Sequence, residues 1–144
     1  MSRVQLALNV DDLDTAMAEL DALAQIFGRD DVYVEIQHAG LEVQTGINAH
    51  LRRIAQDAGL PLVATCDAHY PCREDADSHE ALLAIQTRDV LSNPKRFRFD
   101  ARDFYLKSAA EMREVWSEFP QACDNTLLLA QRCEVTFAEG RNLM

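Results

Sequence analysis

Glycine is scarce and long apolar runs are missing from this sequence. Only five of the 144 residues are glycine, and none belongs to a Gly-rich loop of the kind that holds nucleotide phosphates. No apolar run approaches the roughly 18 residues needed to span a bilayer. The first residues, Met-Ser-Arg-Val, also lack the apolar segment of a secretory signal. We therefore expect no such phosphate-binding loop, no membrane association and a cytoplasmic location.

Basic residues and paired cysteines are scarce as well. The chain has 14 Lys and Arg against 24 Asp and Glu, which gives a formal net charge of −10. Proteins that hold a phosphate backbone need clustered cations, and the densest basic stretch here is only the segment 95–98. We expect the isolated chain not to bind nucleic acid tightly. The four cysteines form no CxxC pattern and are expected to be reduced thiols: Cys66, Cys72, Cys123 and Cys133.

The middle of the chain alternates strand and helix patterns. Residues 32–37 alternate apolar and polar side chains, as in a half-buried strand. Apolar residues then recur at helical spacing over 47–58 until Gly59. Residues 61–66 form a short apolar strand of the kind buried on both faces of a parallel sheet. Because such a crossover returns the second strand parallel to the first, the sequence predicts an α/β fold with a βαβ unit over 32–66.

Helix patterns flank this unit on both sides. Apolar periodicity predicts a helix over 11–27, capped by Asp11 or Asp12, and a further helix over 75–86. Ser108 and Glu111 have the spacing of a capping box, which predicts the start of another helix. A last helix is predicted from Pro120 to about residue 133. Three large apolar residues at helical spacing after Ser108 are assigned to the core rather than to cofactor contacts: Met112, Trp116 and Phe119.

The sharpest chemical feature is the pair Asp67 and His69, directly after the predicted strand 61–66. Side chains two positions apart on an extended segment point to the same side. Ligand sites of α/β folds lie at the carboxyl ends of parallel strands. A carboxylate and an imidazole there are able to bind one metal ion, although two ligands fall short of a complete site. The alternative is a hydrogen-bonded loop pair that fixes the turn, and the residues alone favour this simpler role.

Three neighbours raise the possibility of a larger zinc site, namely Cys66, Cys72 and His79. Their spacing fits no zinc finger or zinc ribbon pattern. Cys66 also projects opposite to Asp67 on a regular strand, which would point its thiol into the core. A buried cysteine and a histidine on a helix surface are therefore the favoured interpretation. The remaining histidines have no partner cluster in the sequence and are assigned structural or exposed positions: His38 and His50.

Several blocks along the chain carry a resemblance to a known family. They include the segments LPLVATCDAHY, EALLAIQT, FYLKSAAEM and ACDNT, with shorter matches between and around them: residues 60–70, 80–87, 104–112, 122–126, 27–30, 34–40, 96–99 and 130–133. Taken in chain order over about residues 20–144, these blocks closely resemble bacterial DNA polymerase III alpha subunits. The resembling stretch runs from the PHP (polymerase and histidinol phosphatase) domain toward the polymerase palm.

The resemblance implies a fold and a metal-binding function. It implies that the chain is a fragment, with part of a distorted βα barrel of the PHP type over 1–100 and a helical connection toward the palm over 101–144. In that domain, His, Asp, Glu and Cys ligands bind divalent ions such as zinc, manganese or magnesium. Asp67 and His69 match its Asp-x-His motif. Members with all ligands support 3′–5′ exonuclease proofreading, whereas in others the domain is structural or carries a separate proofreading subunit.

The sequence also departs from the family pattern. The His-x-His motif and an upstream cysteine ligand are not present, Cys66 replaces the more usual Asn, and the palm would follow Met144. We therefore expect neither a polymerase active site nor a complete exonuclease site in this chain. The implied partners of the parent are DNA, a sliding clamp and a proofreading subunit. Two alternatives are a stand-alone PHP phosphoesterase, which needs a full ligand set, and a non-enzymatic scaffold or interaction module.

Overall fold

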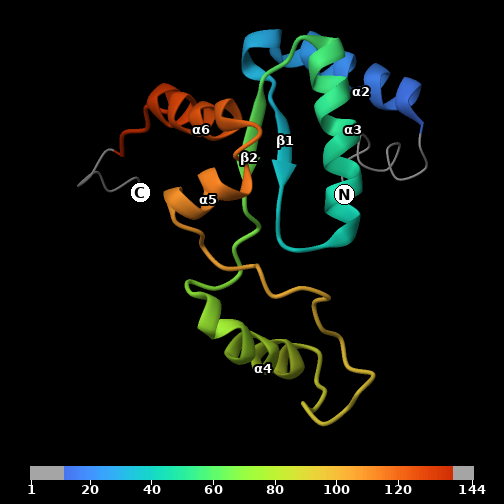
Figure 1. Cartoon of the computed structure of the whole chain (residues 1–144), viewed down its shortest axis with the longest axis vertical. Helices are drawn as coiled ribbons and strands as arrows, with labels where there is room; N and C mark the ends of the chain where they lie inside the picture. Colours follow the sequence, from blue (N-terminus) through green and yellow to red (C-terminus); the bar gives the residue numbers. More distant parts are fainter. Residues whose placement is uncertain (1–11, 138–144) are drawn as a thin grey trace, which may run out of the picture.

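The fold is built around a βαβ unit (Figure 1). The computed structural model describes residues 12–137. In it, β1 (Val34–Gln37) and β2 (Leu62–Thr65) pair in parallel and are joined by α3 (Glu42–Ala58). Val34 lies opposite Leu62, and Gln37 lies opposite Thr65. The predicted α/β class, the βαβ unit and its parallel pairing are confirmed, although both strands are shorter than the sequence predicts.

The connecting helix α3 begins earlier than the apolar pattern indicates. Its first turn starts at Glu42, and its buried side chains are confined to the later turns, at Leu51, Ile54, Ala55 and Ala58. Apolar periodicity therefore could not reveal the polar first turn, where Val43 is exposed. The predicted end is confirmed, because Gly59 adopts a left-handed conformation with φ 64° and donates its N–H to the carbonyls of Ala55 and Gln56.

Helices cover the two strands from both sides (Figure 1). On one side, α2 (Leu13–Phe27) packs on α3 and buries Ala16, Leu20 and Ala24. Of the two predicted caps, Asp12 performs the role, since its carboxylate accepts the N–H of Thr15 at 3.0 Å. The other candidate, Asp11, lies outside the described residues. A 3₁₀ turn, η1 (Arg29–Asp31), leads from α2 to β1.

On the other side, α6 (Pro120–Arg132) packs against β2, and the Asn125 side-chain amide donates to the Leu62 carbonyl at 2.6 Å. The prediction that residues 61–66 are buried on both faces is wrong, because in β2 only Ala64 is fully buried. The described sheet has two strands, so β2 has one neighbouring strand and its other side chains keep partial contact with solvent.

Helix α5 (Ala109–Val115) connects to α6 by a tight turn. The predicted capping box is confirmed, since Ser108 and Glu111 exchange side-chain and main-chain hydrogen bonds. The helix is shorter than predicted: Trp116 is its C-cap, and Phe119 precedes α6 as that helix's N-cap. The core assignment is nevertheless confirmed, because Trp116 is buried and Met112 and Phe119 pack against the same core.

Residues 67–107, here called the α4 region, extend from the carboxyl end of β2 (Figure 1). They contain the 3₁₀ turn η2 (Arg73–Asp75), α4 (Ala76–Gln86) and a long loop. A second apolar cluster lies here, formed by Tyr70, Ala76, Phe104 and Tyr105 together with Ala39 from the loop after β1. On α4, Leu83 and Ala84 are buried, whereas Leu82 and Ile85 are exposed. No helix in the described part of the chain is long and apolar enough to cross a membrane.

Candidate metal-binding site

Asp67 and His69 lie in the loop directly after β2, and their side chains meet. The Nε2 atom of His69 lies 3.3 Å from Oδ1 of Asp67. Their side chains are 36% and 51% exposed respectively, so both remain accessible from solvent. The spacing of two residues at the end of a strand therefore brings a carboxylate and an imidazole to the same side of the loop, as the sequence predicts.

A later segment of the chain holds the backbone of this loop. The N–H of His69 donates to the Phe104 carbonyl at 2.7 Å, and the N–H of Leu106 donates to the Tyr70 carbonyl at 3.1 Å. The N–H of Tyr70 also donates to the Phe104 carbonyl at 3.3 Å. Together with the bond from Leu106, it forms a parallel bridge between Tyr70 and Tyr105. The sequence gives no sign that residues 104–106 pair with the loop that carries His69.

Three aromatic rings pack against the imidazole of His69. The ring centroids of Phe99 and Phe104 lie 4.9 and 5.4 Å from it, nearly perpendicular to it at 79° and 84°. The ring of His79 on α4 lies 5.5 Å away at an angle of 57°. Burial lowers the pKa of His79, and the neighbouring His69 lowers it further. A neutral His79 is thus favoured beside His69.

Of the other candidate ligands, His79 lies beside His69, and the two cysteines differ in their exposure. His79, expected on a helix surface, is instead half-buried against His69, because the loop carrying Phe99 folds over α4. Cys66, expected to point into the core, is only half-buried, since β2 already ends at Thr65. Cys72 is exposed at the start of η2. Within residues 12–137, no group of three or more His, Cys, Asp or Glu side chains is arranged to hold a metal ion.

The remaining histidines belong to no group of three or more candidate metal ligands among residues 12–137. The His38 ring contacts Trp116 edge-on with ring centroids 6.4 Å apart, which agrees with its structural assignment. His50 is half-buried on α3.

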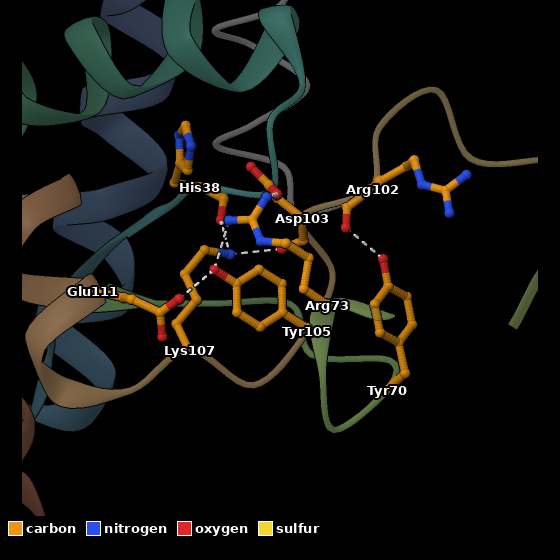
Figure 2. A network of polar contacts seen from close by, with 8 residues as sticks. All are labelled: His38, Tyr70, Arg73, Arg102, Asp103, Tyr105, Lys107 and Glu111. Atoms are coloured by element: carbon orange, nitrogen blue, oxygen red, sulfur yellow. Dashed lines mark hydrogen bonds and ion pairs between the residues drawn. The ribbon is translucent and has the colours of Figure 1, made fainter. Parts of the chain in front are cut away.

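A polar network centred on Tyr105 lies beside the loop (Figure 2). The Tyr105 hydroxyl accepts from Nη2 of Arg73 at 2.8 Å and donates to Oε1 of Glu111 at 2.7 Å. Nη1 of Arg73 also donates to Oδ1 of Asp103 at 3.0 Å. The hydrogen bond from Tyr105, followed by those from Ser108, lowers the pKa of Glu111 to about 2. The same bond raises the pKa of Tyr105, because ionising the phenol would place two negative charges together.

Lys107 extends this network to the loop after β1 (Figure 2). It is a buried lysine, with 8% of its surface exposed. Its ammonium group donates to the carbonyls of Asp103 at 2.6 Å and His38 at 3.4 Å, and it lies 4.6 Å from the centre of the Tyr105 ring. Carbonyl dipoles and an aromatic face therefore replace the water that its charge loses on burial. Alternating apolar and polar patterns carry no signal of such a buried cation.

The Asp67–His69 pair has the chemistry of part of a metal site. A carboxylate oxygen and an imidazole nitrogen suit zinc and manganese, and the carboxylate also suits magnesium. Both side chains are accessible, and they are held on one side of a fixed loop. The pair provides two donors, so further ligands would have to come from outside the described residues. The simpler role, a pair that fixes the turn, agrees equally with the 3.3 Å contact.

Comparison with known proteins gives a consistent set of relatives. No protein-family model matches the sequence. DNA polymerase III subunit alpha of Saccharopolyspora erythraea is 43% identical over 132 residues, which are 91% of this chain and 11% of the relative. The alpha subunit of Mycobacterium tuberculosis is 45% identical over 76% of this chain and 9% of the relative. That of Thermus aquaticus is 41% identical over 93% of this chain and 11% of the relative. The chain thus spans about a tenth of the length of these curated relatives.

Proposed function

The chain belongs to the family of bacterial DNA polymerase III alpha subunits, and from this premise we propose that it works in DNA replication as one segment of such a subunit. The observation that carries the proposal is the 33–45% identity to curated alpha subunits across most of the chain. The family resemblance predicted from the sequence is confirmed by these relatives. A stand-alone phosphoesterase is not favoured, because the match continues through the segments on both sides of Asp67 and His69.

In this proposal the parent performs template-directed DNA synthesis, and this segment contributes structure rather than the polymerase active site. Residues 1–100 would form the last part of a PHP-type βα barrel, and 101–144 would lead toward the palm. The parallel βαβ unit supports the barrel, because such units are its building blocks. The position of Asp67 and His69 after β2 supports it too, since ligand sites in these folds lie at the carboxyl ends of strands.

Asp67 and His69 are proposed to bind a zinc, manganese or magnesium ion together with ligands from elsewhere in the parent. A bound ion would lower the pKa of a water molecule and so support cleavage of a phosphodiester bond in 3′–5′ proofreading. The loop holds the two donors at a fixed separation, and the bridge to Tyr105 restrains its backbone. Alone, the chain would bind the ion weakly and have no nuclease activity, because it supplies too few ligands.

The partners proposed for the parent are DNA, a sliding clamp and a proofreading subunit, in the cytoplasm. The net charge of −10 supports a role for this segment away from the DNA backbone. Other parts of the parent would supply the basic surface that holds the template.

An antibody raised against this chain tests the proposal. It should capture from the source cells a polypeptide roughly ten times as long as the chain, and the captured protein should extend a primed DNA template with the four deoxynucleotides. Antibody that has first been saturated with the chain provides the control and should capture neither. Capture of a short protein without primer extension would contradict the proposal.

A further inference from the structure

Three rings from distant parts of the chain pack against the imidazole of His69. Phe99, Phe104 and His79, here called the aromatic cluster, come from the long loop, the bridge segment and α4. Their centroids lie between 4.9 and 5.5 Å from the His69 ring. Two of them meet it almost at right angles, the edge-to-face arrangement that aromatic pairs prefer. Rotation of His69 about its side-chain bonds would break these contacts.

The aromatic cluster is also packed against itself. Phe99 lies 4.6 Å from Phe104 and 5.2 Å from His79, measured between ring centroids. His79 further contacts Tyr70 at 5.1 Å. Each ring therefore contacts a neighbouring ring as well as His69.

Phe104 acts on the same histidine through its backbone. Its carbonyl accepts the N–H of His69 at 2.7 Å and that of Tyr70 at 3.3 Å. Phe104 is itself buried, with 5% of its surface exposed. One residue thus fixes both the main chain and the ring of His69, although it lies 35 positions later in the sequence.

We propose that Phe99, Phe104 and His79 are positioning residues of the candidate metal site. They hold the His69 imidazole in the one rotamer that places Nε2 3.3 Å from the Asp67 carboxylate. The inference rests on the proposed role of Asp67 and His69 as metal ligands. A ligand that is already oriented loses less conformational freedom when the ion binds. Loss of such outer contacts weakens metal binding by about 10-fold or more.

Nuclear magnetic resonance of the 144-residue chain tests this with Mn²⁺ as the probe. Three-bond couplings report the χ1 rotamer of His69 without metal, and paramagnetic broadening of its ring signals reports Mn²⁺ binding. We expect one rotamer in the wild type. In Phe99→Leu we expect averaged rotamers and about a 10-fold higher Mn²⁺ concentration for the same broadening. Phe27→Leu, which changes an exposed phenylalanine at the end of α2, is the matched control and should behave as the wild type.

The outcomes distinguish the positioning role from the ligand role. Unchanged rotamer and unchanged Mn²⁺ response in both Phe99→Leu and His79→Leu would overturn the positioning role. Asp67→Asn should remove the broadening while leaving the rotamer in place. If the wild type shows no broadening at His69, the ligand role fails, and the rotamer measurement then decides the positioning role alone. Phe104→Leu is a further variant of the aromatic cluster. If Phe104→Leu fails to fold, Phe99→Leu still tests the positioning role.

Discussion

The βαβ region and the α4 region are stabilised by different kinds of contact. Around the strands, aliphatic side chains from α2, α3, both strands and α6 form one continuous core. In the α4 region the buried residues include three aromatic side chains. Hydrogen bonds from Tyr70, Arg73 and Lys107 reach main-chain or side-chain atoms far away in the sequence. The βαβ region is thus stabilised mainly by close packing of apolar side chains. The α4 region is stabilised mainly by specific hydrogen bonds and ring contacts.

This difference has a consequence for the candidate site, which lies where the two regions meet. β2 fixes the start of the site loop, whereas the Phe104 carbonyl and the aromatic cluster fix His69. Substitutions in the βαβ core should therefore act on global stability. Substitutions in the α4 region should change the geometry of the candidate site and lower the free energy of unfolding by a smaller amount.

The largest expected effect is in the βαβ core, from Ile36→Ala. Ile36 on β1 is completely buried, and removing its side chain leaves a cavity between the helices. The free energy of unfolding should fall by about 2–5 kcal/mol, measured by urea denaturation. Ile85→Ala is the matched control, because Ile85 on α4 is 73% exposed; it should change the stability by about 0.5 kcal/mol or less. Equal losses in the two variants would remove the distinction between the regions.

A smaller loss is expected in the polar network, from Tyr105→Phe. The variant keeps the ring but removes the hydroxyl that joins Arg73 to Glu111. We expect a loss of about 1–3 kcal/mol, since the hydrogen bonds involve charged partners. Tyr33→Phe is the control: its hydroxyl has an exposed contact with Arg132 at 3.2 Å, and its loss should cost about 0.5 kcal/mol or less. A neutral effect of Tyr105→Phe would show that the network does not stabilise the region.

The network also predicts a pH dependence. The pKa of Glu111 is lowered from 4.5 to about 2 in the folded chain. Because the folded-state value is the lower one, its contribution is complete above the unfolded value and is lost as the pH falls from 4.5 toward 2. The difference in stability between wild type and Glu111→Gln should therefore be largest near neutral pH and shrink in acid. Glu114→Gln, an exposed change on the same helix, is the control. A pH-independent difference would contradict the lowered pKa.

Apolar periodicity, together with capping residues and glycine at helix ends, was sufficient to predict most of the helices and strands. Residues that face the βαβ core repeat at the period of their element, so α2, α6, both strands and the end of α3 at Gly59 were predicted. The polar first turn of α3 has no such repeat. The partial exposure of Leu62 and Val63 on β2 could not be predicted either, because burial depends on which elements cover a strand as well as on the strand's own residues.

Only the part of the candidate site formed by residues close together in the sequence could be predicted. Asp67 and His69 are two residues apart, so the geometry of an extended chain brings them to one side. Phe99, Phe104 and His79 reach His69 from positions 10 to 35 residues later, through a loop without periodicity. The burial of Lys107 likewise depends on carbonyls of Asp103 and His38, which any residue could provide. Contacts made by backbone atoms and rings across such separations leave no pattern in a single sequence.

The smallest effect on stability, and the sharpest on binding, is expected from Asp67→Asn at the boundary of the two regions. Asp67 is half-exposed and contacts only His69 among the ion pairs of the described residues, so the free energy of unfolding should change by about 0.5 kcal/mol or less. Calorimetric titration of the wild type with zinc or manganese should show weak metal binding. Asp67→Asn should lose this binding, since one of the two donors is removed.

Asp57→Asn, a change on the exposed surface of α3, is the control and should retain the metal binding. Neither the wild type nor the variants should release nucleotides from a DNA 3′ end, and robust nuclease activity of the isolated chain would contradict the two-donor interpretation.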